Sequence, residues 1–429
     1  MTPHPSNESD ISPRLVLLLA LASGLIVANL YYAQTLVGPI SAATGLSSGA
    51  AGLIVTLTQL GYAIGLLFIV PLGDLVENRR LVTAALLLTA LALMAAAAST
   101  RAWQFLAAAL LVGVGSVAAQ VLVPFAAHLS REETRGRTVG KVVSGLLLGI
   151  MLARPAASLV ANYAGWQLVF GGASLLILLL AAVLWRQLPR RVPAATLGYT
   201  ELIGSMWRLF ASTPLLRRRA AYHAGLFASF SLFWTVAPML LAGPRFQLSQ
   251  NGIALFALVG MAGAVASPVA GRLADAGHTL PATAAALLLG IAGCALPLFA
   301  PDSRHAALAL LLSAAIVLDM AVAANLVLGQ RAIFGLPAQQ RSRLNGLYFA
   351  LFFAGGALGS ALGAWLYARF GWQAAMLAGM AFPALALPLW FGELGQSAGR
   401  RRATAAAPGR SKLQQSAAPR PASPAGTSY

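Results

Sequence analysis

The stretch 71–81 reads P-L-G-D-L-V-E-N-R-R-L, from Pro71 to Leu81, and forms a short charged island between two long apolar runs. Much later in the chain a related stretch, Gly271 to His278, reads G-R-L-A-D-A-G-H and lies between apolar runs as well. A charged motif at corresponding places in two hydrophobic segments indicates an internal duplication.

Three further pairs of segments support the duplication, because they recur in the same order and at nearly the same separation. The hexapeptide 135–140 (R-G-R-T-V-G) corresponds to 341–346 (R-S-R-L-N-G). The tripeptide G-W-Q occurs at 165–167 and again at 371–373, and 116–120 (S-V-A-A-Q) corresponds to 321–325 (A-V-A-A-N). With an even number of helices in each half, this pattern predicts two parallel repeats related by an axis along the membrane normal.

The composition identifies a membrane protein. The 429 residues are 59% hydrophobic and only 9% charged, whereas soluble domains carry about 25% charged residues. Apolar runs long enough to cross a bilayer must be helical, because unpaired backbone groups are too costly in lipid. We therefore predict an all-α integral membrane protein with twelve transmembrane helices in two six-helix bundles, at 15–37, 50–72, 80–99, 103–126, 139–161, 167–186, 219–242, 251–272, 280–300, 305–329, 344–367 and 373–393.

The net charge of +18 reflects membrane topology. If the N-terminus lies inside, most of the 29 Lys and Arg residues fall in cytoplasmic segments. The exceptions are one arginine within an apolar run, Arg154, and four in outside loops, Arg101, Arg245, Arg304 and Arg369. This is the positive-inside pattern. It predicts a multi-pass protein of the inner (plasma) membrane with both termini cytoplasmic, in contact with the lipid bilayer and not with nucleic acid.

These patterns divide the chain into five parts. We predict an N-terminal cytoplasmic tail at 1–13, a six-helix bundle at 14–187, a cytoplasmic linker at 188–218, a second bundle at 219–394 and a disordered cytoplasmic tail at 395–429. Apolar residues at helical spacing between Tyr199 and Phe210 predict an interfacial helix in the linker; the alternative is a flexible linker. The single cysteine, Cys294, rules out a disulfide within the chain. The long first apolar run is expected to be retained.

Small residues at four-residue spacing recur on four of the apolar runs and allow close approach of helix backbones. They fall on corresponding runs of the two repeats, so we expect them to join the two halves at a sliding surface. The alternative is ordinary contact within each half. The residues are Gly61 and Gly65; Gly145 and Gly149; Gly263 and Ser267; and Gly355, Gly359 and Gly363.

Two ionisable residues lie deep within apolar runs. Asp319 is near the middle of 305–329, whereas the other ten acidic residues lie in tails, loops or helix ends. Arg154 lies about two-thirds of the way along 139–161. Ionisable groups inside a bilayer are costly and mark functional sites. Asp319 is therefore the predicted proton carrier, the alternative being a structural aspartate; Arg154 is predicted to act in gating or folding rather than in substrate contact.

The charged loops also resemble a known family. Gly271-Arg-Leu-Ala-Asp275 matches the loop signature of the major facilitator superfamily, and Pro71-Leu-Gly-Asp74 followed by Arg79-Arg80 matches it in part. Val70, Leu75 and Glu77 depart from that signature. Gly145-x-x-x-Gly149 followed by Arg154-Pro155 looks like a variant of the antiporter motif, with a displaced proline. The resemblance to the superfamily covers the chain from about residue 14 to 394, and this variant motif resembles the drug–proton antiporter branch.

The resemblance implies that the first, fourth, seventh and tenth helices line a central cavity. Their polar and aromatic residues give a mostly neutral site for small-molecule substrates. Each candidate could instead serve helix contact, and Asp319 is rotated by about 120° from Asn325 at 3.6 residues per turn. The predicted cavity residues are Asn29, Tyr32, Gln34, Ser116, Gln120, Trp234 and Asn325.

The resemblance also implies that the charged loops act in gating. Asp74 is expected near the start of the eleventh helix, around 343–345, and Asp275 near 140–141 of the fifth. Closing these contacts would favour the outward-facing state. The predicted gating residues are Gly73, Asp74, Arg79, Arg80, Arg154, Pro155, Gly271 and Asp275.

These expectations add up to a secondary active transporter that exports small organic compounds by proton antiport. It would be a monomer without a cofactor or metal. The alternative is an importer or facilitator of a sugar or an organic acid. A membrane-embedded enzyme would need clustered acids or histidines, and a receptor a folded cytoplasmic domain; the sequence shows neither. A phosphate-binding P-loop is also missing, so ATP does not drive the chain directly.

Overall fold

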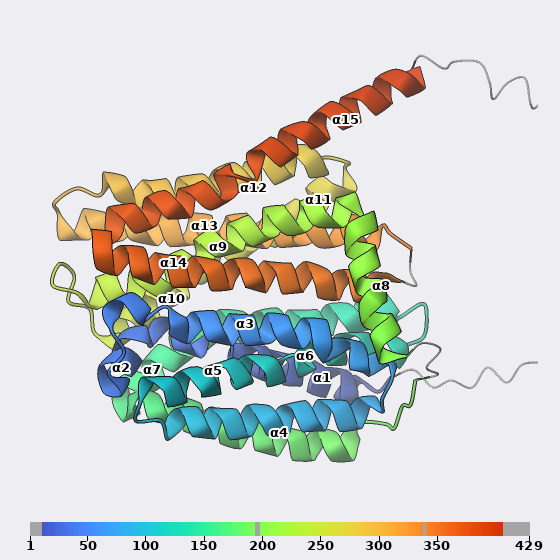
Figure 1. The fold of residues 1–429 in the computed structure, drawn as a ribbon, viewed down its shortest axis with the longest axis horizontal. Helices are drawn as coiled ribbons and strands as arrows, with labels where there is room; N and C mark the ends of the chain where they lie inside the picture. The colour runs from blue at the N-terminus through green and yellow to red at the C-terminus, as the bar shows by residue number, and fades with distance from the viewer. Residues whose placement is uncertain (1–10, 194–197, 338–339, 406–429) are drawn as a thin grey trace, which may run out of the picture. The chain divides into compact units, whose positions relative to one another are not determined.

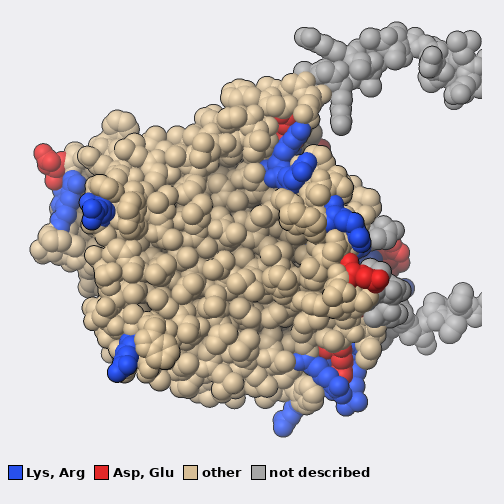
Figure 2. Space-filling model, viewed as in Figure 1, with Lys and Arg blue, Asp and Glu red and all other residues tan. Residues whose placement is uncertain are grey.

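The computed structural model describes residues 11–193, 198–337 and 340–405, and these residues contain helices and no strand. Nine helical stretches among them are long and apolar enough to cross a membrane, and Pro13–Ala28 is a shorter apolar helix. On the face shown in Figure 2, charged side chains lie near two opposite ends with a broad uncharged surface between them. The prediction of an all-α integral membrane protein is confirmed.

We call residues 11–187 the first half. Its elements are α1 (Pro13–Ala28), η1 (Tyr32–Thr35), α2 (Val37–Thr44), η2 (Ser48–Ala50), α3 (Leu53–Phe68), η3 (Val70–Asp74), α4 (Asn78–Ala97), α5 (Ala102–Ser116), α6 (Ala118–His128) and α7 (Arg135–Gln187). The first predicted run is interrupted after Ala28. There the side-chain amide of Asn29 donates to the carbonyl oxygens of Leu25 and Ile26 and caps α1.

We call residues 214–386 the second half, and α8 (Tyr199–Ser212) precedes it. Its elements are α9 (Pro214–Ala242), α10 (Gln250–Gly260), η4 (Met261–Val265), α11 (Ala266–Asp275), α12 (Thr279–Ala295), η5 (Leu296–Phe299), α13 (Arg304–Phe334) and α14 (Arg341–Ala384).

The two G-W-Q tripeptides mark breaks in the two longest helices. α7 has 53 residues and α14 has 44, although about 20 suffice to cross a bilayer. Gly165 has φ 79° and Gly371 has φ 80°, so neither residue is helical. Only glycine adopts this conformation without strain. In the predicted set of twelve membrane spans, α7 and α14 each contribute to two spans. The number twelve remains a prediction.

The helices of the two halves occupy separate sides in Figure 1, with α1–α7 on one side and α9–α14 on the other. α3 contacts α14 across the boundary between them. The hydroxyls of Thr56 and Ser360 lie 2.8 Å apart, and the Gln59 amide donates to the Ser231 hydroxyl at 2.8 Å. Polar side chains therefore join the halves along this boundary.

The predicted role of the small residues is wrong, because their close contacts lie within each half. A Cβ atom added at Gly149 of α7 would lie 2.2 Å from the Gly24 carbonyl oxygen of α1. One added at Gly359 of α14 would lie 2.0 Å from the Ala228 carbonyl oxygen of α9. The same holds for the other glycines of the set: Gly61 faces α5, Gly65 faces α5 and Val117, Gly145 faces α1, Gly263 faces α13, and Gly355 and Gly363 face α9. The glycines of this set thus bring helices together within each half rather than between the halves.

The linker contains a helix where the sequence predicts one. α8 runs across the ends of the other helices in Figure 1. The Tyr199 hydroxyl donates to the Phe68 carbonyl oxygen at 2.8 Å, and Arg343 of α14 donates to the Ser205 hydroxyl at 2.8 Å. Met206 and Leu209 are buried in a cluster with residues of α14. α8 therefore contacts both halves at one end.

The last described helix, α15 (Leu387–Ala405), belongs to a separate unit of the chain. It continues past residue 394, so 395–405 of the predicted disordered tail are helical, in keeping with their alanine and arginine content. Residues 1–10 of the predicted N-terminal tail, 194–197 of the linker and 406–429 of the C-terminal tail lie outside the described residues.

Candidate functional site

An ion pair joins the two halves deep in the helical region. Nη2 of Arg154, on α7, donates to Oδ2 of Asp319, on α13, at 3.4 Å. The side chains are only 2% and 12% exposed, respectively. A lone buried charge is expensive, and a partner offsets part of that cost. The two ionisable residues that the sequence singles out are thus brought together.

Trp234 of α9 contacts both members of this pair. Its indole N–H donates to Oδ1 of Asp319 at 3.0 Å. The guanidinium carbon of Arg154 lies 3.8 Å from the centre of the Trp234 ring and 5.2 Å from that of Phe230. A cation over an aromatic face is stabilised by the ring quadrupole. The carboxylate, the guanidinium and the indole therefore form one unit, which we call the central triad.

Two glycines make room for the central triad. A Cβ atom at Gly260 would lie 2.8 Å from the Trp234 ring, and one at Gly263 would lie 2.5 Å from Cβ of Asp319. The sequence marks Gly263 only as a small residue for helix contact and gives no signal for Gly260. Their effect on the triad depends on distances across helices, which spacing along one helix does not give.

Arg154 keeps unused hydrogen-bonding capacity. Its Nε and Nη1 are buried and have no hydrogen-bond partner among the described residues. The next residue, Pro155, lacks an N–H group, so the helix loses the hydrogen bond that this group would give to the carbonyl of Met151. The Thr35 hydroxyl donates to the Arg154 carbonyl oxygen at 3.4 Å and ties η1 to α7.

The predicted cavity residues near the start of the chain have different surroundings. Gln34 is fully buried, and neither of its side-chain amide atoms has a partner in the described part of the chain. The amide nitrogen of Asn29 is used in capping α1, whereas its Oδ1 is buried without a described partner. Tyr32 is half-buried against the core of the first half. Of these three, Gln34 has the most free polar groups.

The repeat-related residues Gln120 and Asn325 differ in their contacts. Asn325 is buried within the second half, and its amide lies 3.0 Å from Nδ1 of His223. The His223 ring stacks on Phe352, with 4.3 Å between ring centres. Ser116 bonds to the Val112 carbonyl within α5. Gln120 instead lines a small pocket between the halves.

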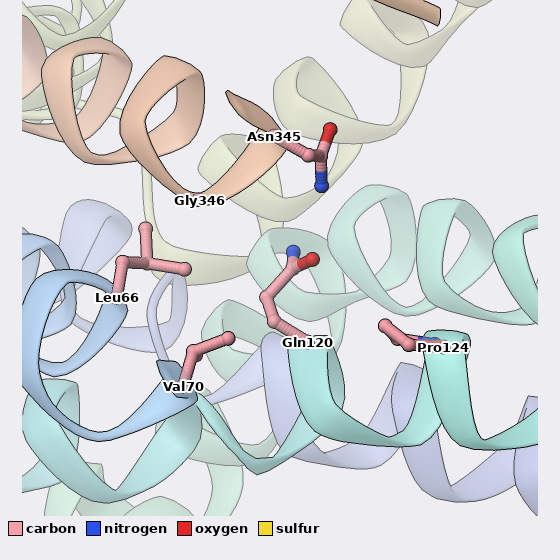
Figure 3. A pocket seen from close by; sticks show the side chains of 6 residues that line it. All are labelled: Leu66, Val70, Gln120, Pro124, Asn345 and Gly346. Carbon is pink, nitrogen blue, oxygen red and sulfur yellow. The ribbon is translucent and has the colours of Figure 1, made fainter. Parts of the chain in front are cut away.

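That pocket is formed by α3, η3 and α6 of the first half and by α14 of the second half. Figure 3 shows the side chains of Gln120 and Asn345 pointing toward one another across it. Its lining residues are Leu66, Val70, Gln120, Pro124, Asn345 and Gly346.

The predicted gating residues of the first loop hold that loop together locally. Glu77 forms ion pairs with Arg79 and Arg80 at 3.4 and 2.9 Å. Asn78 donates to the carbonyl of the buried Gly73 at 3.0 Å. Arg79 lies over the ring of Trp185, 4.5 Å from its centre. These contacts all lie within the first half.

The expected contacts between the loops and the opposite halves are not seen among the described residues. Asp74 is exposed and has no side-chain hydrogen bond to α14 there. Asp275 pairs with Arg331 of α13, in its own half, next to the buried Gly271. The carboxylate of Asp275 is therefore paired with a cation of its own half rather than with the N-terminal end of α7. The gating role of the loops remains a prediction.

Comparison with known proteins agrees with this architecture. The family model described as Major Facilitator Superfamily matches residues 17–333. The uncharacterized transporter YgaY of Escherichia coli O157:H7 is 41% identical over 382 residues, which cover 89% of this chain and 96% of that protein. The probable transporter SCO4007 of Streptomyces coelicolor is 32% identical over 377 residues, which cover 86% of this chain and 85% of that protein.

Solved structures share the fold at low sequence identity. A bacterial homolog of the human lysosomal transporter Spinster, in an inward-facing and unoccupied conformation, has a TM-score of 0.68 and 15% identity. The match covers 91% of this chain and 97% of that one. The nucleoside transporter NupG (D323A mutant) also has a TM-score of 0.68 and 15% identity, covering 89% and 99%. Together with the family match and the relatives named as transporters, these findings show that the chain belongs to the major facilitator superfamily of membrane transporters.

Proposed function

We propose that this chain couples the movement of small organic compounds to protons, with Asp319 as the proton carrier. The observation that supports this most directly is the ion pair between Arg154 and Asp319. It is buried, and it joins helices of two different halves. A proton on Asp319 removes the charge that holds Arg154, so protonation and the contact between the halves depend on each other.

This dependence links a proton to alternating access. Rocking of two six-helix bundles around a central site exposes that site to each side in turn. With Asp319 ionised, the central triad favours the arrangement in which Arg154 and Asp319 join the two halves. With Asp319 protonated, the remaining attraction to Arg154 is weaker and the halves separate more easily. The protein would act as a monomer in the inner membrane, with both termini in the cytoplasm.

Export by proton exchange is the first candidate for the direction. It rests on the resemblance of Gly145, Gly149 and Arg154-Pro155 to the antiporter motif. The compound would lie among the aromatic rings of α9 and the neutral amide of Gln34. Tyr32, Asn29, Ser116 and Gln120 complete the proposed set of cavity residues. Asn325 does not join this set, because its amide contacts His223 within the second half.

Reconstitution into liposomes with an imposed pH gradient tests the coupling. A panel of organic compounds is screened for gradient-driven movement, while an internal dye reports the proton flux. We expect Asp319→Asn to lose gradient-driven transport and to retain exchange of labelled for unlabelled compound. Asp302→Asn, at an exposed position, is the matched control and should behave as the unsubstituted chain. Full gradient-dependent transport by Asp319→Asn would contradict the role of Asp319.

Uptake of an organic acid is the second candidate, and Arg154 favours it. Its buried Nε and Nη1 lack described partners, and a guanidinium fork matches a carboxylate. A carboxylate that replaces Asp319 on Arg154 would leave Asp319 to take up a proton. Proton and substrate would then bind together, whereas in export by exchange they bind alternately. The sign of the proton flux in the same liposomes separates the two candidates.

A further inference from the structure

The pocket between Gln120 and Asn345 lies between the two halves, and no residue of the central triad lines it. Its lining combines residues of α3, η3 and α6 with residues of α14. The residues of α14 belong to the first two turns of that helix, the end at which Arg343 binds α8. A group bound here would touch both halves at the α8 end of the molecule.

The chemistry of the pocket is polar and uncharged. None of its lining residues carries a charge. Oδ1 of Asn345 is buried and has no hydrogen-bond partner in the described residues, and the Gln120 side chain points toward it (Figure 3). Pro124 has no N–H group, so the main-chain carbonyl of Gln120, one turn earlier, lacks the helical hydrogen bond that another residue at 124 would donate. Buried polar groups normally have partners, so the unpartnered Oδ1 of Asn345 beside a cavity points to a ligand.

The repeat gives an independent reason to single out Gln120. The amide of its counterpart in the second half, Asn325, contacts Nδ1 of His223. The His223 ring in turn stacks on Phe352. Both positions carry an amide side chain, and of the two only Gln120 lines the pocket described above. The side chain of Gln120 therefore borders the pocket, whereas the amide of Asn325 is used inside its own bundle.

We propose that this pocket binds one uncharged hydrogen-bonding group, a hydroxyl or an amide, of the transported compound. The cavity volume is about 20 Å³, which has room for one group of the size of a water molecule. Asn345 and Gln120 accept and donate hydrogen bonds, and Leu66, Val70 and Pro124 exclude a charged group. This proposal rests on the proposed transport function. The pocket would favour transported compounds that have a neutral polar end.

Cysteine protection with small probes tests the site directly. Val70→Cys is placed in a Cys294→Ser background, and its reaction with N-ethylmaleimide is timed in membranes without a proton gradient. The probes are formamide against formate, and urea against guanidinium, which match in shape and differ in charge. We expect formamide and urea to slow labelling roughly twofold at a concentration near their dissociation constant, and formate and guanidinium to leave it unchanged.

Three variants make the result specific. Gln120→Leu and Asn345→Leu should remove the protection by formamide and urea. Gly346→Ala should weaken it without unfolding the protein, because the added Cβ would meet its nearest atoms at 3.7 and 4.0 Å. Gly140→Ala, where no atom lies within 4 Å of the added Cβ, is the matched control and should keep full protection.

Equal protection by formate or guanidinium would overturn the proposal, as would unchanged protection in the two leucine variants. Asp319→Asn separates this proposal from proton coupling. Protection should persist in that variant even though gradient-driven transport is expected to be lost. Loss of protection with the two leucine variants therefore supports the pocket whatever the outcome of the coupling experiment.

Discussion

At the scale of single residues, Arg154 and Asp319 carry opposite charges and are both largely buried. Breaking a buried ion pair by removing one partner costs about 3–5 kcal/mol, because the other charge is left uncompensated. Removing both charges avoids that penalty. The pair should therefore show strong thermodynamic coupling.

We predict that Arg154→Gln and Asp319→Asn each lower the midpoint of thermal unfolding in detergent, and that the double variant recovers part of the loss. The double-mutant cycle measures this coupling between neighbours directly. If the losses of the two single variants simply add in the double variant, the residues do not form a working pair.

The sequence identifies both members of this pair and does not reveal that they meet. Asp319 and Arg154 stand out because each is an ionisable residue within an apolar run. Trp234 stands out as an aromatic residue on a predicted cavity helix. Their contact depends on how α7, α9 and α13 are placed in space, and the bond between Asn325 and His223 depends on the same placement. Spacing along one helix carries no such information.

At the scale of helices, glycines decide how closely neighbours approach. The Cβ of an alanine at Gly149 would lie 2.2 Å from the carbonyl oxygen of Gly24, so α1 and α7 must separate to admit it. We predict that Gly149→Ala destabilises the protein by about 1–3 kcal/mol, measured as a lower unfolding midpoint. Gly172→Ala, on the same helix with nothing within 4 Å of the added Cβ, should be neutral. Equal midpoints for the two variants would contradict this assignment.

The breaks in α7 and α14 depend on glycine for a different reason. Gly165 and Gly371 have φ near 80°, and a non-glycine residue in such a conformation costs about 1–3 kcal/mol. We predict that Gly165→Ala and Gly371→Ala each lower the unfolding midpoint and that their effects add, because the sites are independent. Gly136→Ala, with free space around its Cβ, is the control. A midpoint that either break variant leaves unchanged would show that the position tolerates a side chain.

The sequence predicts the helices better than their contacts. Long apolar runs bounded by charged loops predict the all-helical membrane fold, and the G-W-Q repeat coincides with both breaks. The stripes of small residues are visible in the sequence as well. Which helix each stripe faces is not, because close approach within a half and close approach between halves require the same small residues. The prediction that these small residues join the two halves is wrong for this reason.

At the scale of the whole molecule, the two halves meet along α3 and α14. The Thr56 and Ser360 hydroxyls are 2.8 Å apart, which is close enough for cysteines at these positions to form a disulfide. We predict that Thr56→Cys with Ser360→Cys, in a Cys294→Ser background, loses transport on oxidation and regains it on reduction. Each single cysteine variant is a control and should respond to neither treatment. Normal transport by the fully cross-linked protein would contradict rocking of the halves along this boundary.

The close glycine contacts within each half also bear on how the chain is made. α1 can dock on α7, and α3 on α5, using contacts that involve no residue of the second half. The first bundle can therefore assemble in the membrane while the rest of the chain is still leaving the ribosome. The second bundle would then pack against a first bundle that is already folded. The ion pair between Arg154 and Asp319 would be among the last contacts formed during biogenesis.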